Sequence, residues 1–160
     1  MKLRPTKNGL PAETREAMVE VLNARLADTL DLALATRHAH WNCKGMNFIA
    51  VHTFLAGLRG DLDGYADALA GRALQLGGAA LGTIQAVEAQ SALDMYPVEI
   101  HTVKDHLLAL VARYASLASA VRANINDADE ASDAGTVDLL TDYLRGLDKQ
   151  VWKLEAHLGA

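Results

Sequence analysis

Two histidines and an aspartate between positions 40 and 67 have the residue types expected of a metal site. His40, His52 and Asp67 provide two imidazoles and one carboxylate, which suit divalent iron, zinc or manganese. His40 and His52 are twelve residues apart, so only tertiary or subunit packing can bring them together. No other part of the sequence groups histidines and carboxylates at such ligand-like spacings. Chemistry is therefore expected in residues 40–78.

Asp63 is a further candidate ligand, because it shares a helix face with His52 and Asp67. At about 100° per residue, positions 52, 63 and 67 fall within roughly a third of the circumference of a helix. The alternative interpretation is that the carboxylates are solvated and that the histidines make ordinary hydrogen bonds. Spacing alone leaves both interpretations open.

Four long amphipathic segments must position these side chains. Apolar residues recur at three- and four-residue steps in each segment, the pattern of helices with one buried face. Pro11 suits a first helical position, Asn47 can cap the second helix, and Gly77 with Gly78 can end it. The predicted helices span residues 11–43, 48–76, 98–125 and 136–158.

Two longer connections flank the third predicted helix. Residues 79–97 contain a predicted short helix around 83–90. A connection of this length can run from one end of a four-helix bundle to the other. An acidic loop is predicted over residues 126–135, before the fourth helix opens at Thr136.

Composition predicts a single all-α domain over residues 11–160. Of the 160 residues, 51% are hydrophobic but only 5% are aromatic, and only three are prolines, a balance that favours packed helices. Cys43 is the only cysteine, so no intrachain disulfide can form. The sequence shows neither an apolar leader nor a long apolar run. A cytoplasmic protein without membrane contact is expected.

Charge distinguishes the first ten residues from the rest of the chain. The net charge is −5, so the body of the protein is expected to repel nucleic acid. Residues 1–10 instead contain Pro5, Gly9 and three basic side chains, which predicts a mobile tail that can meet phosphate groups. The basic residues are Lys2, Arg4 and Lys7.

The stretch HWNCKGMNFIAVH, which begins at His40, resembles the signature of the Dps mini-ferritins, the DNA-binding proteins from starved cells. The similarity continues through RALQLGGAALGT, YPVEIHTVKDHL, RYASLASAVR and LDKQVWKLE, and covers nearly everything after Pro11. This resemblance implies a ferritin-like four-helix bundle with a long crossover between the second and third helices. It also implies a hollow homododecamer that oxidises iron(II) with hydrogen peroxide, stores the ferric mineral and so protects DNA under stress.

The resemblance also implies an iron site shared by two-fold-related subunits. His40 and His52 match the histidine ligands of the family, and Asp67 matches one of its carboxylate ligands. The carboxylates expected four residues after His52 and four after Asp67 are replaced by Ala56 and Gly71. Iron needs oxygen donors, so the loss of two negative charges per site predicts ferroxidase activity that is weak, altered or lost.

Other residues acquire candidate roles from the same resemblance. Trp41 matches an indole beside the iron centre that intercepts oxidising equivalents, and packing in a core or an interface is the alternative. Cys43 is predicted to be a small buried thiol. Carboxylates of the acidic segment are candidates to line three-fold pores that admit cations, with a solvated acidic turn as the alternative. These are Asp127, Asp129, Asp133 and Asp138.

Two other functions stay open beside the ferroxidase cage. One is a non-catalytic cage that binds and compacts DNA through its basic tails, with weak and non-specific contacts and a place in the nucleoid. The other is a cage whose sites hold zinc or another divalent metal instead of iron. Gly57, Gly60 and Gly64 also make the second helix unusually rich in glycine, which fits either close subunit contact or a dismantled site.

Overall fold

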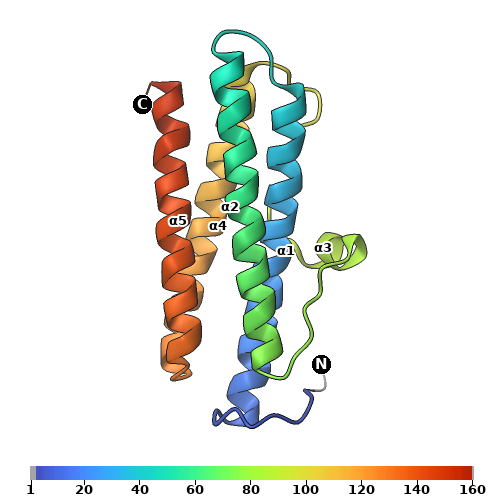
Figure 1. Cartoon of the computed structure of the whole chain (residues 1–160), viewed down its shortest axis with the longest axis vertical. Helices are drawn as coiled ribbons and strands as arrows, with labels where there is room; N and C mark the ends of the chain where they lie inside the picture. The colour runs from blue at the N-terminus through green and yellow to red at the C-terminus, as the bar shows by residue number, and fades with distance from the viewer. Residues whose placement is uncertain (1–2, 160) are drawn as a thin grey trace.

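Five helices make up the computed structural model, which describes residues 3–159 (Figure 1). Helix α1 packs along α2 and α4 packs along α5, around a common core. The described residues contain no β-strand, so the prediction of an all-α bundle is confirmed, and none of their helices has the length and apolarity to cross a membrane. The bounds are α1 Ala12–Asn42, α2 Phe48–Gln75, α3 Ile84–Gln90, α4 Val103–Glu130 and α5 Ala134–Leu158.

The core consists of leucines at helical spacing on the inner face of each long helix, together with two buried tyrosines. The Thr29 hydroxyl of α1 donates to the Arg25 carbonyl, so the Tyr143 hydroxyl of α5 donates to Thr29 over 2.6 Å. Burial raises the pKa of Tyr143, which keeps this hydroxyl protonated. Aliphatic packing and a satisfied hydroxyl pair together hold α1 against α5.

The ends of α1 and α2 follow their prediction with two differences. Pro11 is the N-cap of α1 and lies one residue before the helix. Asn47 precedes α2 as predicted, but its backbone is left-handed (φ 63°) and its side chain makes no capping hydrogen bond. Gly77 ends α2 as predicted, with φ 92° and its N–H bonded to the Leu74 carbonyl.

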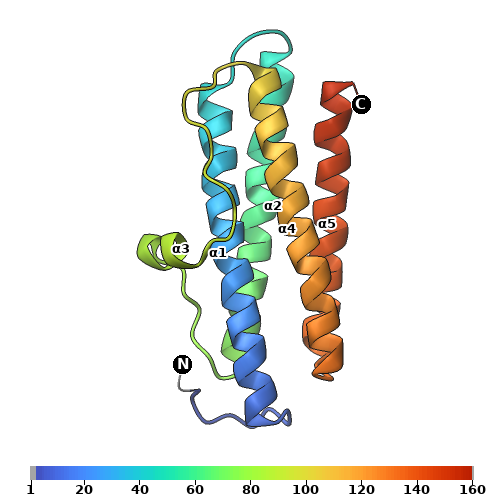
Figure 2. The same ribbon diagram turned by 180° about the vertical axis from the view of Figure 1, so that it is seen from behind.

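The segment between α2 and α4 runs from one end of the bundle to the other, and it carries α3 (Figure 2). Polar side chains of α1 hold it in place. Asn23 bonds to the backbone of residues 79 and 81, and Asp28 accepts from the Ala92 N–H at 2.8 Å. The predicted crossover is therefore confirmed, and its anchors are polar α1 residues that the apolar pattern does not reveal.

Helix α4 begins and ends five residues later than the predicted range of 98–125, so that prediction is wrong at both ends. At the start, the Thr102 hydroxyl accepts from the Asp105 N–H and donates to the Asp105 carboxylate, which caps the helix. The apolar pattern continues upstream through Val98 and Ile100. Periodicity alone therefore places the start of the helix too early.

Residues 126–135 do not form the predicted acidic loop. Helix α4 continues to Glu130, because Ala128 is fully buried and extends its inner face. The connection to α5 is a tight turn in which Ser132 adopts a left-handed backbone conformation (φ 57°). Most of the acidic residues in this region are therefore helical.

Asp133 is a buried structural residue at the start of α5. Its carboxylate caps the helix by accepting from the Thr136 N–H, and it pairs with Arg72 of α2 at 2.5 Å. Only 1% of its surface is exposed. The prediction that Asp133 lines a pore is therefore wrong, and the carboxylate instead ties the α4–α5 turn to the end of α2.

Replacing Asp133 by alanine is expected to lower the free energy of unfolding by about 3–5 kcal/mol, because Arg72 would be left without its buried partner and α5 without its cap. Asp138→Ala is the matched control, since Asp138 is exposed on the same helix, and should change stability by about 0.5 kcal/mol at most. Urea unfolding followed by circular dichroism measures both. Equal stability of the two variants would contradict a structural role for Asp133.

His106 of α4 is fully buried beneath the crossover. Its Nδ1 lies 2.7 Å from the Tyr96 hydroxyl, while its Nε2 has no hydrogen-bond partner among the described residues. Burial lowers the pKa of His106, and His38 and His101 lower it further, although Asp105 and the Ile100 carbonyl raise it. Folding therefore favours the neutral imidazole.

The free energy of unfolding is expected to decline as the pH falls below about 6.5, the ordinary pKa of histidine. The folded pKa of His106 is lowered, so the unfolded chain takes up a proton first and stability is lost until the folded group titrates too. His106→Gln should flatten this part of the stability curve, as measured by urea unfolding between pH 7.5 and 5. The exposed His157 provides the control substitution to Gln, and equal flattening by both variants would refute the assignment.

Candidate functional site

His40 and His52 lie side by side at the α1–α2 turn. His40 is in the last turn of α1 and His52 is near the start of α2, so the helical hairpin brings them together. Their rings are stacked, with centroids 3.7 Å apart and planes 20° from parallel. Packing within one subunit therefore joins the two histidines.

Each histidine is oriented by the backbone of the other. His40 Nδ1 donates to the His52 carbonyl at 2.8 Å, and His52 Nδ1 donates to the His40 carbonyl at 2.8 Å. A carbonyl oxygen can only accept, so both Nδ1 atoms carry hydrogen. In the neutral rings each Nε2 then has a free lone pair, the tautomer that binds metals. The pair is thus prepared to offer two nitrogen ligands.

The turn around the histidines is itself held in place. Gly45 has φ 113°, which favours glycine, and the Lys44 N–H bonds to the His101 carbonyl at 2.9 Å. Cys43 is 2% exposed and burial raises the pKa of its thiol, as expected for an unreactive cysteine. The turn is therefore hydrogen-bonded to the segment before α4, and it offers no thiolate ligand.

The candidate carboxylates are far from the histidines of their own subunit. Asp67 lies fifteen residues after His52 on the same straight helix, which corresponds to about 22 Å, and Asp63 is separated from His52 by about 16 Å of helix. Among the described residues, no three His, Cys, Asp or Glu side chains gather closely enough to hold a metal ion. Although Asp63 and Asp67 lie on the same helix face as His52, they do not form a metal site with it within one subunit.

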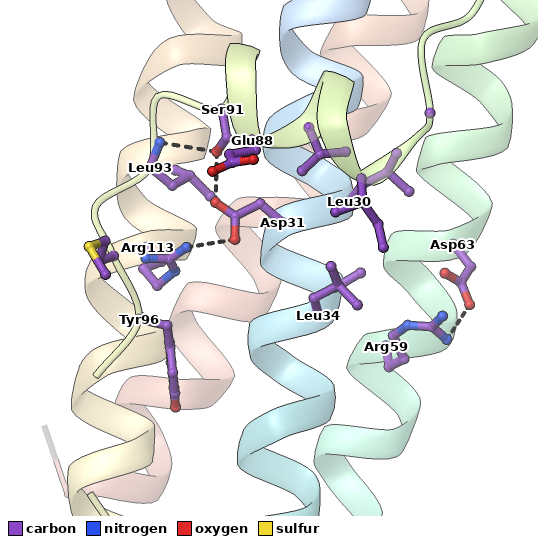
Figure 3. Close-up of a pocket in the computed structure, with 15 residues that line it drawn as sticks. Leu30, Asp31, Leu34, Arg59, Asp63, Glu88, Ser91, Leu93, Tyr96 and Arg113 are labelled. Atoms are coloured by element: carbon purple, nitrogen blue, oxygen red, sulfur yellow. Dashed lines mark hydrogen bonds and ion pairs between the residues drawn. The ribbon is translucent and has the colours of Figure 1, made fainter. Parts of the chain in front are cut away.

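Asp63 is paired with a cation of its own helix. Arg59 Nη1 and Asp63 Oδ2 are 2.5 Å apart, an i,i+4 pair that its spacing could have revealed (Figure 3). Asp67, in contrast, is exposed and makes no ion pair or hydrogen bond with the described residues. Of the two carboxylates, only Asp67 is free to bind a group outside the subunit.

A largely apolar pocket lies beside the Arg59–Asp63 pair, between α1, α2 and the crossover. Its volume is about 520 Å³. Within it, Asp31 accepts from Ser91 at 2.7 Å and from Arg113 at 3.1 Å (Figure 3). Apolar side chains around this pocket are exposed in the single subunit, namely Leu34 (52%), Ile84 (77%) and Met95 (96%). An apolar surface of this kind is typical of protein–protein contacts.

Trp41 follows His40 and is 69% exposed. The Arg37 guanidinium lies 5.8 Å from the centroid of its ring, within the range of a cation–π contact. Packing in the core of the subunit is therefore excluded for this indole. Interception of oxidants beside a metal and packing between subunits stay predictions.

Three of the four predicted pore carboxylates are exposed. Asp127 and Asp129 lie in the last turns of α4, and Asp138 lies in the second turn of α5. Asp129 and Asp138 border the same surface hollow, while Asp127 accepts from the Asn124 amide at 2.8 Å. These carboxylates can attract cations, but a ring of them requires further subunits.

Arg4, one of the three basic residues predicted to contact DNA, is attached to the end of α2. Its guanidinium donates to the Leu74 carbonyl at 2.7 Å, and its N–H donates to the Gly77 carbonyl at 2.8 Å. Lys7 is exposed, whereas Lys2 lies outside the described residues. The mobility predicted for residues 1–10 stays a prediction, but Arg4 already has partners.

Comparison with known proteins identifies relatives along the whole chain. Residues 19–160 match the ferritin-like domain family. A DNA protection during starvation protein of Agrobacterium fabrum is 48% identical over 99% of this chain and 98% of its own length. The Dps structure from Mycobacterium smegmatis has a TM-score of 0.93 at 33% identity, covering 100% of this chain and 90% of that one.

A third similar structure is the Dps protein of Vibrio cholerae O1, described as a member of a broad superfamily of ferritin-like diiron-carboxylate proteins. Its TM-score is 0.91 at 26% identity, and the match covers 99% of both chains.

Proposed function

Because this chain belongs to the ferritin-like family of DNA protection during starvation proteins, we propose that it forms a closed homododecamer that sequesters iron in the cytoplasm. The cage takes up iron(II), oxidises it with hydrogen peroxide and retains the ferric product, which limits hydroxyl-radical damage to DNA. Iron is substrate and cargo in this function. The supporting observation is the reciprocal hydrogen bonding of His40 and His52, which leaves both Nε2 atoms available as ligands.

The missing carboxylate comes from a second subunit. If two α2 helices run antiparallel across a two-fold axis, His52 of one reaches the level of Asp67 of the other when the axis passes midway between them, near Gly60. Open space surrounds the positions where Cβ atoms would lie on Gly57, Gly60 and Gly64, so a second backbone can approach closely. This arrangement gives the glycine-rich stretch of α2 a physical reason.

The exposed apolar side chains around the pocket support the same arrangement. Leu34, Ile84 and Met95 lie on the side of the subunit where α1, α2 and the crossover meet, and a partner would remove them from water. In the closed cage Asp127, Asp129 and Asp138 attract iron(II) towards the entrance. Trp41 stands beside the site, where its indole intercepts oxidising equivalents.

Light scattering combined with size-exclusion chromatography tests the cage. The protein should elute as one species of about twelve subunit masses, and ferric absorbance should travel with that species after additions of iron(II) and peroxide. A stable monomer would contradict the assembly. A dodecamer from which all iron separates would contradict the storage function.

A DNA-binding role is the second candidate, supported by the exposed Lys7 and by the DNA protection role in the name of the Agrobacterium relative. Three basic side chains in residues 1–10 allow few phosphate contacts per subunit, so binding depends on many tails acting together.

We expect weak DNA binding that decreases steeply with salt and disappears when residues 1–8 are deleted, because counterion release by the tails is its main driving force. Lys7→Gln and Arg4→Gln should each weaken binding in a gel-shift assay at low salt, because each removes one exposed positive charge and the carbonyl that Arg4 contacts does not neutralise it. Full DNA affinity in the truncated protein would contradict a role for the tail.

A further inference from the structure

We propose that Tyr96 and His106 form a redox pair that gives one electron to a strong oxidant of the hydroxyl-radical class, while the phenol proton passes to the imidazole. Such an oxidant arises when a single iron(II) reduces hydrogen peroxide, so its source rests on the proposed function. The pair itself rests on the contacts of the two side chains beneath the crossover.

Tyr96 is the one tyrosine of this chain whose hydroxyl is bonded to a base. Its oxygen lies 2.7 Å from Nδ1 of His106. The hydroxyls of Tyr114 and Tyr143 bond instead to threonine hydroxyls, which are not bases at neutral pH, and Tyr65 makes no hydrogen bond among the described residues. An oxidised phenol is a strong acid, so a tyrosine with a bonded base loses an electron more readily than one without. Tyr96 is therefore the tyrosine best prepared for oxidation.

The proton between the two side chains belongs to the phenol before oxidation. Burial raises the pKa of Tyr96 and lowers the pKa of His106. The hydroxyl thus stays protonated at neutral pH and donates to Nδ1, which carries a lone pair. His106 is fully buried, so water does not compete for this nitrogen. The imidazole is placed to receive the proton as the electron leaves.

Charged neighbours determine how strong the oxidant must be. The Arg113 guanidinium lies 5.7 Å from the centroid of the Tyr96 ring, and a cation at this place opposes loss of an electron (Figure 3). The pair is therefore suited to hydroxyl radical rather than to hydrogen peroxide itself. After the transfer, Asp105 and the Ile100 carbonyl stabilise the His106 imidazolium, against the opposing effect of two neighbouring histidines.

Trp41 connects the pair with the candidate iron site. The edge of the His38 ring meets Tyr96, with centroids 5.6 Å apart. Residues three apart are neighbours on a helix surface, so Trp41 lies one turn beyond His38, and it directly follows His40. The exposed indole has no hydrogen-bonded base among the described residues. An oxidised Trp41 can therefore draw an electron from Tyr96, where proton transfer stabilises the product.

The step balances without a further reactant. The hydroxyl radical takes one electron and becomes hydroxide, while Tyr96 becomes a neutral tyrosyl radical and His106 an imidazolium. The next iron(II) returns one electron and His106 returns the proton, which restores both side chains. Two irons that arrive one after the other thus reduce one peroxide without releasing a radical.

Pulse radiolysis tests the pair without iron. Azide radicals remove one electron from exposed aromatic side chains, and in the full-length protein the absorbance of tryptophan radical should give way to that of tyrosyl radical. Tyr96→Phe should remove most of the tyrosyl radical. Tyr143→Phe is the matched control, because it removes a buried tyrosine that has no base, and should leave the yield unchanged.

His106→Gln keeps a hydrogen-bonding side chain but removes the base, so tyrosyl radical should form about tenfold more slowly or worse. In heavy water the unaltered protein should also form the radical more slowly, and this isotope effect should vanish in His106→Gln. A merely structural role of His106 would not change the isotope effect. Circular dichroism of each variant checks that the helix content is retained.

Electron paramagnetic resonance after addition of iron(II) and peroxide identifies the radical without any substitution. Ring-deuterated tyrosine should narrow the signal, whereas ring-deuterated tryptophan should not. Equal tyrosyl yields in Tyr96→Phe and the unaltered protein, equal loss in Tyr143→Phe, or an unchanged rate in His106→Gln would each overturn the pair.

The two oxidants separate this inference from the proposed function. A tyrosyl radical that forms with azide but not with iron(II) and peroxide would support the pair and count against the proposed iron chemistry. Iron that is oxidised and retained in the cage, with no tyrosyl radical from either oxidant, would contradict the pair alone.

Discussion

Placing carboxylates at positions 56 and 71 is expected to raise the initial rate of peroxide-driven iron(II) oxidation by roughly tenfold or more. The changes are Ala56→Asp and Gly71→Glu. Reduction of hydrogen peroxide to water requires two electrons, and two irons held together can supply both at once, whereas a single iron supplies one. The added oxygens would give the second iron its ligands, so the double variant should exceed the combined effect of the single ones.

The fold should tolerate both substitutions. Residues 56 and 71 lie on α2 away from the core, and a Cβ at Gly71 would meet no atom within 4 Å. Glutamate is also a better helix former than glycine, by about 0.5–1 kcal/mol. Stopped-flow absorbance measures the rate, and Ser116→Glu, at an exposed position of α4, controls for added negative charge. Rapid oxidation by the unaltered protein, with no gain in the double variant, would show that other donors complete the site.

The substitution Leu34→Asp is expected to prevent assembly of the dodecamer. Leu34 is 52% exposed in the single subunit and lines the apolar pocket between α1, α2 and the crossover. A partner that covers this surface would have to bury the new carboxylate, which costs several kcal/mol without a counter-charge. Sedimentation velocity should show a subunit or a small oligomer in place of the cage.

The fold of the Leu34 variant should persist, because the carboxylate would be solvated in the free subunit. Circular dichroism should therefore show unchanged helix content. Ser116→Asp, which adds the same charge to an exposed position of α4, should leave the dodecamer intact. Iron oxidation should be lost together with assembly, since Asp67 would no longer reach the histidines of another subunit. A Leu34 variant that still forms the dodecamer would contradict the predicted interface.

Apolar periodicity predicted the four long helices and the crossover because burial of one face determines both. Apolar periodicity predicted the wrong helix ends where capping hydrogen bonds and buried polar groups determine them. The apolar pattern places the start of α4 too early, since a threonine cap and a backbone bridge to Lys44 set the true start. The predicted acidic loop is wrong because Ala128 is buried and Asp133 is a buried cap, and charge composition does not reveal either fact.

For the candidate metal site, the sequence likewise predicted the residues but not their arrangement. Residue type and spacing identified His40, His52 and Asp67 as candidates, but spacing along the chain does not define the distances between their side chains. The hairpin joins the histidines, whereas about 15 residues of straight helix keep Asp67 away from them in one subunit. The reciprocal carbonyl bonds that select the Nε2 ligands involve the backbone, and sequence patterns carry no information about such contacts.

Anomalous diffraction from crystals of the assembly soaked anaerobically with iron(II) tests the central claim, an iron site shared between two subunits, most directly. The account predicts anomalous signal at the iron edge between facing α2 helices, beside the imidazoles of His40 and His52 and within bonding distance of Asp67 from the facing subunit. An anomalous map from a His52→Ala crystal should lose that signal. Iron bound elsewhere, with both histidines and Asp67 unoccupied, would contradict the shared metal site.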